Sequence, residues 1–290
     1  MSGRHVLLIL TCIALSACAS KFPSPEWAVH SESSPNGVEI FTNTFNTHGG
    51  ESLDQLNDVN VSITGKWKKL IRKIQPLVTD FNYRVDSQER LLPQARINAA
   101  LYRGPGGTKK VIRTPDSIDV YYNDLQSTQP DVMSSTALTA DSFHLFLLGS
   151  LALEPWRNQF TRLTDETEND TRYYRIHVYR TPGFGFSTSD EVVLWINQQT
   201  NRTYKVQITL EGHSTTKGAH VEVAYLDYEQ RGAYLFPSKF IEKVNAPVAL
   251  NAHAWTLTGL DINRDLRLSD LTGKGYSKQA SVPAKEMLTE

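Results

Sequence analysis

Residues 192–210 have the sequence VVLWINQQTNRTYKVQITL, which contains two strand-like runs. Apolar residues fill 192–196, and apolar and polar residues alternate from 204 to 210, as they do in β-strands. The polar segment NQQTN at 197–201 separates the two runs at the spacing of a hairpin. The stretch therefore predicts two antiparallel strands.

Further strand patterns lie on both sides of this hairpin. They fall at 59–63, 96–102, 109–113, 118–122, 173–179, 221–225, 234–244 and 255–262, with glycine- and proline-containing turns between most of them. We expect an acidic loop at Thr164–Asp170. The spacing of the turns predicts a mainly β (α+β) protein with one strongly curved antiparallel sheet of at least seven strands and no parallel core.

Three segments predict helices. The first is 38–46, and the second is 66–74, where Trp67, Leu70 and Ile71 begin an apolar stripe opposite a basic face. The third, Asp141–Leu153, is apolar on nearly every side, which predicts burial all round. This run is too short to span a membrane, and the polar stretch 125–137 before it would allow it to move as a lid.

The N-terminus has the basic residues Arg4 and His5, then an apolar stretch from Val6 to Leu15, and then Leu-Ser-Ala-Cys18. This pattern predicts a signal peptide over 1–17 and resembles the lipobox of bacterial lipoproteins. The resemblance implies acylation of Cys18 as the lipid attachment, followed by a tether over 18–37. In the enterobacterial pattern, Asp at the second position after this cysteine retains a lipoprotein in the inner membrane. This chain has Ser20 at that position, so the resemblance implies the outer membrane, facing the periplasm. The alternative is an ordinary signal peptide with an incidental cysteine.

Composition excludes several classes of protein. The 290 residues carry 30 Lys and Arg against 31 Asp and Glu, which gives no bulk attraction to nucleic acid. Both cysteines, Cys12 and Cys18, lie in the first 18 residues, which excludes a disulfide framework in the body. We expect one domain over 38–272 and a loose tail over 273–290.

Catalytic and metal-binding signatures are missing from the sequence. It contains no G-x-S-x-G, H-E-x-x-H or phosphate-loop motif, so we predict no enzyme, no catalytic residues, no metal and no cofactor. Three weaker patterns remain: His213 with His220 as metal ligands, Asp261–Asp265 as half a calcium loop, and Gly104–Lys110 as an anion loop. Surface or turn roles are the competing interpretation of each. The basic helix at 66–74 could contact anionic headgroups, and the alternative is a helix that packs on the sheet with its basic face in solvent.

The order of several short motifs is similar to that of the LolA/LolB-type lipoprotein carriers. These motifs are His48-Gly-Gly-Glu-Ser-Leu53, Gly65-Lys-Trp67, Val193–Asn197, Tyr204–Val206, Tyr225–Tyr228 and Phe236–Phe240. The resemblance covers about half of the chain. It implies an unclosed antiparallel half-barrel, with helices covering the concave face over an apolar cavity that takes acyl chains. The segment at 66–115 departs from the family, and the chain has no recognisable equivalent of the carrier's key arginine or the receptor's protruding leucine loop.

The candidate cavity residues follow from the apolar runs and from this resemblance. They are Trp67, Phe143, Phe146, Leu147, Leu151 and Trp195. The leading hypothesis is a lipid-anchored, periplasm-facing protein that binds a lipid or a lipoprotein acyl chain and takes part in their trafficking. The membrane, through the N-terminal acyl chains, and such an apolar ligand are its predicted partners; no protein partner is predicted. The alternatives are a structural envelope lipoprotein whose barrel is filled by its own side chains, and a hydrolase with a site that no motif reveals.

Overall fold

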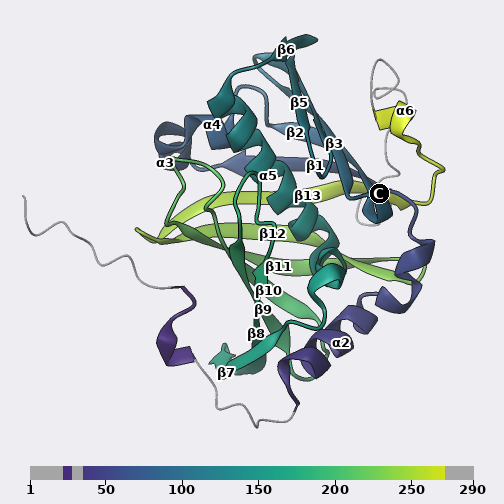
Figure 1. The fold of residues 1–290 in the computed structure, drawn as a ribbon, viewed down its shortest axis with the longest axis vertical. Coiled ribbons are helices and arrows are strands. Elements are labelled where there is room, and N and C mark those ends of the chain that lie inside the picture. The colour runs from purple at the N-terminus through teal and green to yellow at the C-terminus, as the bar shows by residue number, and fades with distance from the viewer. Residues whose placement is uncertain (1–21, 28–34, 272–290) are drawn as a thin grey trace, which may run out of the picture.

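Each strand pairs antiparallel with its neighbours in one thirteen-stranded sheet (Figure 1). The computed structural model describes residues 22–27 and 35–271. The strands are β1 (Val59–Trp67), β2 (Asp86–Leu92), β3 (Ile97–Gly104), β4 (Gly107–Arg113), β5 (Ile118–Tyr122), β6 (Leu125–Ser127), β7 (Thr161–Glu168), β8 (Thr171–Arg180), β9 (Asp190–Asn197), β10 (Thr203–Thr209), β11 (His220–Arg231), β12 (Tyr234–Ala246) and β13 (Leu250–Ile262). The predicted mainly β, unclosed antiparallel half-barrel is confirmed.

Helices are few and mostly short. They are η2 (Pro25–Trp27), α2 (Gly37–Thr47), η3 (Gly50–Gln55), α3 (Lys69–Ile74), α4 (Pro76–Thr79), η4 (Pro93–Ala95), α5 (Pro130–Leu148), η5 (Gly149–Trp156) and α6 (Leu268–Leu271), where η marks a 3₁₀-helix. Helix α2 begins with a capping box in which Asn36 and Glu39 bond each other's backbone N–H groups, as its sequence favours.

The topology explains why α5 lies on a face of the sheet. Strands β1–β6 run outward to one edge, and β7–β13 run back from the other edge until β13 pairs with β1. The chain between β6 and β7 therefore has to pass from one edge of the sheet to the other. Helices α5 and η5 make this connection, and Figure 1 shows α5 lying over the middle strands.

Helix α5 corrects two predictions. It begins at Pro130, so most of the stretch 125–137 is not a hinge but strand β6 and the first turns of the helix. Pro130 suits a first helical position, and the polar residues after it are buried because Ser135, Thr139 and Ser142 donate to backbone carbonyls of the preceding turn. Together α5 and η5 are long and apolar enough to cross a membrane, against the sequence-based expectation, although most of the segment is buried in the fold.

Two further boundaries differ from prediction. Residues 164–168 of the predicted acidic loop belong to β7, an edge strand that tolerates polar side chains on its open side. Lys66 and Trp67 of the predicted basic helix lie in β1, and the helix starts at Lys69. With six residues, α3 buries Ile71 but leaves Leu70 half exposed, so the predicted apolar stripe does not pack as one face.

The His-Gly-Gly motif ties α2 to the sheet. His48 Nδ1 donates to the carbonyl of Leu235, and its Nε2 accepts from the N–H of Thr203, so the ring bridges β10 and β12. Burial lowers the pKa of His48 to about 4, so the ring is neutral in this role. Gly49 takes a φ of 93°, and a Cβ there would lie 2.5 Å from the carbonyl oxygen of Ala233.

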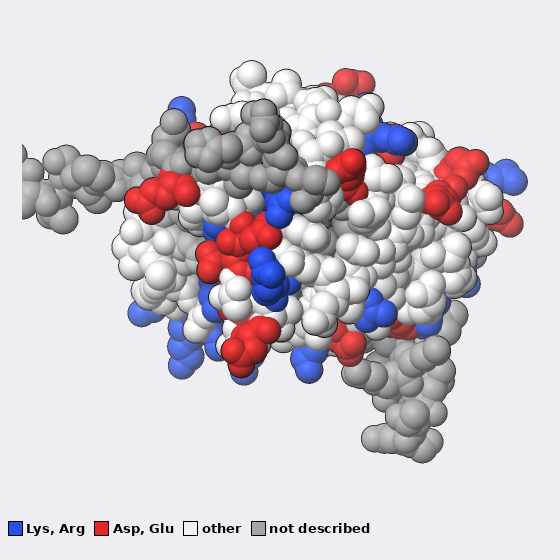
Figure 2. Space-filling view, turned by 90° about the horizontal axis from the view of Figure 1, so that it is seen from below, with Lys and Arg blue, Asp and Glu red and all other residues white. Residues whose placement is uncertain are grey.

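Charged side chains of both signs are mixed on the surface of the protein (Figure 2). Acidic and basic side chains are interspersed among uncharged ones on the face shown in Figure 2, in keeping with the near-neutral net charge.

Residues 22–27 of the predicted tether pack against the sheet face opposite α5, where Phe22 stacks on His220 with ring centroids 4.6 Å apart. Six residues of the predicted tether thus contact the domain, and the assignment of 18–37 as a tether stays a prediction.

Candidate apolar binding site under helix α5

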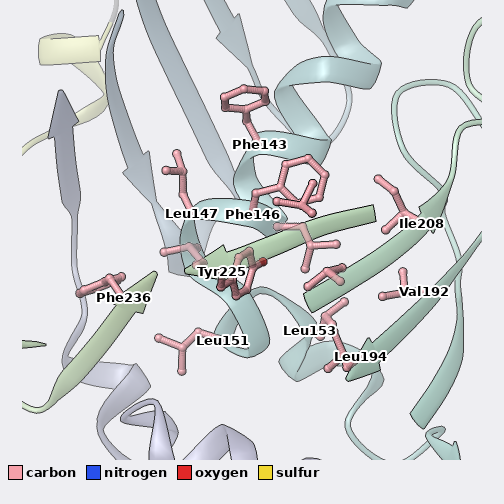
Figure 3. Close-up of a cluster of buried hydrophobic side chains, with 14 of the residues drawn as sticks. Phe143, Phe146, Leu147, Leu151, Leu153, Val192, Leu194, Ile208, Tyr225 and Phe236 are labelled. Atoms are coloured by element: carbon pink, nitrogen blue, oxygen red, sulfur yellow. The ribbon is translucent and has the colours of Figure 1, made fainter. Parts of the chain in front are cut away.

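The helix-covered face of the sheet carries a continuous apolar cluster (Figure 3). Alternation along β9 directs Val192, Leu194 and Ile196 to this face, and all three are fully buried. Residues from β8, β10, β11, β12, β13 and β1 join the same cluster. The cluster thus lines the concave side of the half-barrel.

Four of the predicted site residues form the cover of this cluster. Phe143, Phe146, Leu147 and Leu151 are 2–5% exposed and project from α5 and η5 toward the sheet (Figure 3). The ring of Phe143 lies 5.3 Å from that of Trp255, and Phe146 lies 6.1 Å from it, centroid to centroid. These four residues belong to one buried apolar cluster with the concave face, and their role in binding a ligand stays a prediction.

An aromatic row forms the floor beneath α5. Tyr225 on β11 faces Phe240 on β12, which faces Trp255 on β13, with centroid distances of 5.5 and 4.8 Å. The next position in the row is Gly65 on β1. A Cβ at Gly65 would lie 2.8 Å from that of Trp255, so glycine there leaves room for the indole. The row was invisible in the sequence, because it depends on the register of four strands.

Trp67 lies at the end of this floor. Its ring stacks on His253 at 3.9 Å, and His253 in turn lies 6.4 Å from Phe143. The guanidinium of Arg84 sits over the rings of Trp67 and Phe143 at 5.7 and 5.0 Å. Trp67 thus lies beside the apolar cluster, in a small separate group with Ile71 and Ala252, and its role in binding a ligand stays a prediction.

Trp195 is separated from the other predicted residues. It points to the opposite face of β9, where it packs with Phe22, Tyr173 and Val193. Its Nε1 donates to Gln207, and Lys205 lies 4.2 Å over its ring. The apolar run 192–196 is buried on both faces of the strand, so the sequence alone did not show which residues face the helix.

Three polar groups under the helix lack partners in the described part of the chain. They are the hydroxyl of Tyr225, the indole N–H of Trp255 and the hydroxyl of Ser150, all in residues no more than 3% exposed. Burial also raises the pKa of Tyr225, so its hydroxyl keeps its proton. Each unsatisfied buried group destabilises the folded protein by about 1–3 kcal/mol. These donors would be satisfied by the carbonyl oxygens of an ester or amide.

Polar contacts hold the first half of α5 on the sheet. Arg113 on β4 forms a two-pronged ion pair with Asp141, with both N···O distances 2.9 Å. Lys109 donates to Thr136 at 3.0 Å, and Asn98 donates to the carbonyl of Ala140. The second half of the helix, from Phe143 onward, is held mainly by the apolar contacts described above.

Two small hollows border this cover. One, of about 120 Å³, lies between α5, β3, β4 and the loop after β8, and the other, of about 200 Å³, lies along η5. They share Arg96, His144 and Ala152 in their walls. Under the helix itself, side chains of the cover and the sheet fill the concave face.

Several buried titratable side chains lie near Trp67, at the end of the aromatic floor beneath α5. Burial raises the pKa of both Glu89 and Glu242 to about 7, and nearby Arg84 opposes this shift in each. Burial, together with Arg84, lowers the pKa of His253 well below its usual value. Glu242 and His253 are therefore largely neutral neighbours at acidic pH, 3.9 Å apart.

The weaker sequence patterns have structural roles in the fold. His213 bonds Ser134 at 2.8 Å, whereas His220 stacks on Phe22, so the two do not meet. The 261–265 turn closes on Asp58, whose carboxylate accepts from the N–H groups of Arg264 and Leu266. Gly104–Gly107 is the β3–β4 turn. Within the described residues no group of three or more His, Cys, Asp or Glu is placed to hold a metal, and Cys18 lies outside them.

The geometry defines a helix-covered, unclosed antiparallel half-barrel with an apolar concave face. No protein-family model matches the sequence, and no curated protein matches it. Solved structures do match. A LolA superfamily protein from Nitrosomonas europaea is 13% identical, with 85% of this chain and 99% of that chain covered and a TM-score of 0.49.

Two other matches are more distant in shape or sequence. A DUF1329 family protein from Desulfovibrio piger is 11% identical, over 81% of this chain and 96% of that chain, with a TM-score of 0.47. The lipoprotein LppX from Mycobacterium tuberculosis is 10% identical, over 81% and 100%, with a TM-score of 0.28. At such low identity, the function has to be inferred from the residues of this chain.

Proposed function

We propose that this protein is an outer-membrane-anchored, periplasm-facing lipoprotein that binds the acyl chain of a lipid or lipoprotein under α5 and serves in its trafficking. The observation that supports this most is the set of buried, unpartnered polar groups on Tyr225, Trp255 and Ser150 at the closed cover. A cover that only filled the barrel would gain from satisfying or replacing them. An acyl ligand brings both an apolar chain for the cluster and ester carbonyls for these donors.

Anchoring rests on the sequence, because Cys18 lies outside the described residues. The short apolar stretch and the Leu-Ser-Ala-Cys18 lipobox support it. Ser20 supports sorting to the outer membrane. In this proposal the protein acts by binding and not by catalysis.

The competing function is a structural lipoprotein. It is favoured by the filled state of the concave face, where Phe146 and Leu147 are each 2% exposed. The two functions share the same closed structure and differ in whether α5 leaves the sheet. Native mass spectrometry of the body from Lys21 onward, expressed in the periplasm, tests this directly, since a binding protein retains co-purified lipid.

A matched pair of variants locates the bound ligand. Val192 and Val193 are adjacent on β9 and both fully buried, but they face opposite sides of the sheet. Val→Ala at either position should reduce the free energy of unfolding by a similar amount, about 1–3 kcal/mol. Only Val192→Ala should change the affinity for an apolar fluorescent dye, measured by titration beside a thermal melt.

A substitution in the cover provides a second test of the proposed binding function. Phe146→Ala should enlarge the site and raise dye binding while the melt stays cooperative. If Phe146→Ala instead loses about 2–5 kcal/mol and neither it nor the wild type binds dye, the protein is a filled scaffold and the binding function is wrong.

A further inference from the structure

The hollow of about 120 Å³ beside α5 has an unusual charge. Three arginines line it, Arg96, Arg113 and Arg180, against one carboxylate, that of Asp141. The two-pronged pair with Arg113 already occupies Asp141, which also accepts from the N–H of Gly185 at 2.7 Å. The charges of Asp141 and Asp190, the latter opposite Arg180 on β9, also act on Arg180. Among the residues that line the hollow itself, the three arginines still outnumber the single carboxylate.

Arg180 is fixed in place before any ligand arrives. Its guanidinium lies over the rings of Phe184 and Trp156 at 4.4 and 5.2 Å. Its Nη1 donates to the carbonyls of Pro182 and Gly183. A guanidinium clamped between two rings and two carbonyls is pre-organised, so little side-chain freedom is lost when it binds an oxyanion.

The neighbouring groups favour an anion with a further hydrogen-bonding group. Burial lowers the pKa of His144 to about 4, and the charges of Arg180 and Arg96 contribute to this lowering. His144 is therefore a neutral imidazole at the opening. Asn98 is 4% exposed and lines the hollow, and its Oδ1 has no donor among the described residues. It would accept from a hydroxyl on the ligand.

The hollow continues into an apolar crevice. Arg96, His144 and Ala152 are common to both spaces, and the second space of about 200 Å³ is lined by Leu53, Leu148 and Leu151 among others. Leu148 and Leu151 also belong to the apolar cluster under α5. The basic hollow therefore adjoins a second hollow whose wall includes two residues of the apolar cluster.

We propose that this arginine-lined hollow binds the anionic headgroup, a phosphate or similar oxyanion, of an amphiphile whose chain enters the crevice beside η5. The inference rests on the proposed function, because it names the class of acyl ligand that the half-barrel takes. Arg96 and Arg180 hold the oxyanion, Asn98 accepts from a hydroxyl next to it, and the chain lies on Leu53, Leu148 and Leu151.

The test uses the full chain released from non-ionic detergent in native mass spectrometry. The probes are decyl phosphate, decanol and inorganic phosphate, and the variant is Arg96→Gln, since Arg96 is exposed and carries no core contact. Arg103→Gln at the other end of β3 is the matched control, because it is also exposed but lies away from the hollow. We expect decyl phosphate to bind the wild type and Arg103→Gln alike, and Arg96→Gln at least tenfold more weakly.

The three probes and the two variants distinguish a failure of the headgroup site from a failure of the proposed function. Equal binding of decyl phosphate by Arg96→Gln and the wild type overturns the headgroup site, while decanol binding still reports on the proposed function. Inorganic phosphate binding as tightly as decyl phosphate overturns the amphiphile and leaves a site for free phosphate. If neither decyl compound binds, the proposed function fails together with this inference.

Discussion

Glu242 shows how a single residue links burial to pH. The side chain is buried on β12 against His253, and its Oε2 finds no hydrogen-bond donor among the described residues. Burial raises the pKa of this carboxyl from 4.5 to about 7. The folded state therefore holds the proton more tightly than the unfolded state does. Its contribution to stability is full below pH 4.5 and is lost as the pH rises through 7.

Glu242→Gln should remove this loss. We expect the variant and the wild type to melt at similar temperatures near pH 4.5. At pH 8 we expect the variant to be more stable by about 3 kcal/mol, or roughly 6–12 °C in Tm. Glu51→Gln, at an exposed position, is the control and should leave Tm unchanged. A Tm difference for Glu242→Gln that does not grow between pH 4.5 and 8 would contradict the assignment.

At the scale of elements, one nearly buried ion pair is among the contacts that hold α5 on the sheet. Arg113 and Asp141 are each nearly buried, and their two-pronged pair joins β4 to the middle of the helix. Asp141→Asn leaves the guanidinium without its counter-charge, which should destabilise the fold by about 3 kcal/mol. If α5 moves to admit a ligand, the same variant should also bind an apolar dye faster than the wild type in stopped flow.

The control for this variant is a second ion pair of the same form. Arg162 and Asp165 on β7 make a similar two-pronged contact, remote from α5. Asp165→Asn should change stability without changing the rate of dye binding. Equal dye rates in Asp141→Asn and the wild type would show that this pair does not hold the cover closed.

Strands and helices were predictable from the sequence where the spacing of apolar residues matches the pattern of burial in the structure. The strands after residue 171 were found from the sequence by alternation or, for β9, by a continuous apolar run, and the 197–201 turn was found as well. Strand β2 went unnoticed because DSQERLL is polar, although Glu89 and Arg90 are buried inside the sheet. The first half of α5 was missed because its serines and threonines satisfy themselves on the helix backbone, which no apolar period reveals.

The candidate site was predictable only in part for a similar reason. Phe143, Phe146, Leu147 and Leu151 share a dense apolar run, so burial together was a safe inference. Tyr225, Phe240 and Trp255 meet through strand register, and the arginines of the hollow come from three separate strand ends. Neither grouping leaves a pattern along one segment of sequence.

At the scale of the whole molecule, the docked segment 22–27 bears on how an anchored protein would face the membrane. Phe22 packs with Tyr173 and Trp195 on the face opposite α5, and Trp27 lies 4.3 Å under the guanidinium of Arg175. Cys18 is four residues before Phe22, and four extended residues reach at most about 14 Å. A lipid on Cys18 would thus keep this face of β8–β10 near the bilayer and leave the cover on the other side of the sheet.

Single cysteines can measure this orientation, because acylation would consume the thiol of Cys18. Tyr179 is 58% exposed on the anchored face of β8, and Leu125 is 75% exposed at the far edge strand β6. We expect a fluorophore on Tyr179→Cys to be quenched more strongly by bromolipid vesicles than one on Leu125→Cys. Adding Phe22→Ala and Trp27→Ala should release the segment, lengthen the reach of the anchor and reduce the difference. Equal quenching at both positions in the otherwise wild-type chain would mean that the docked segment does not orient the protein.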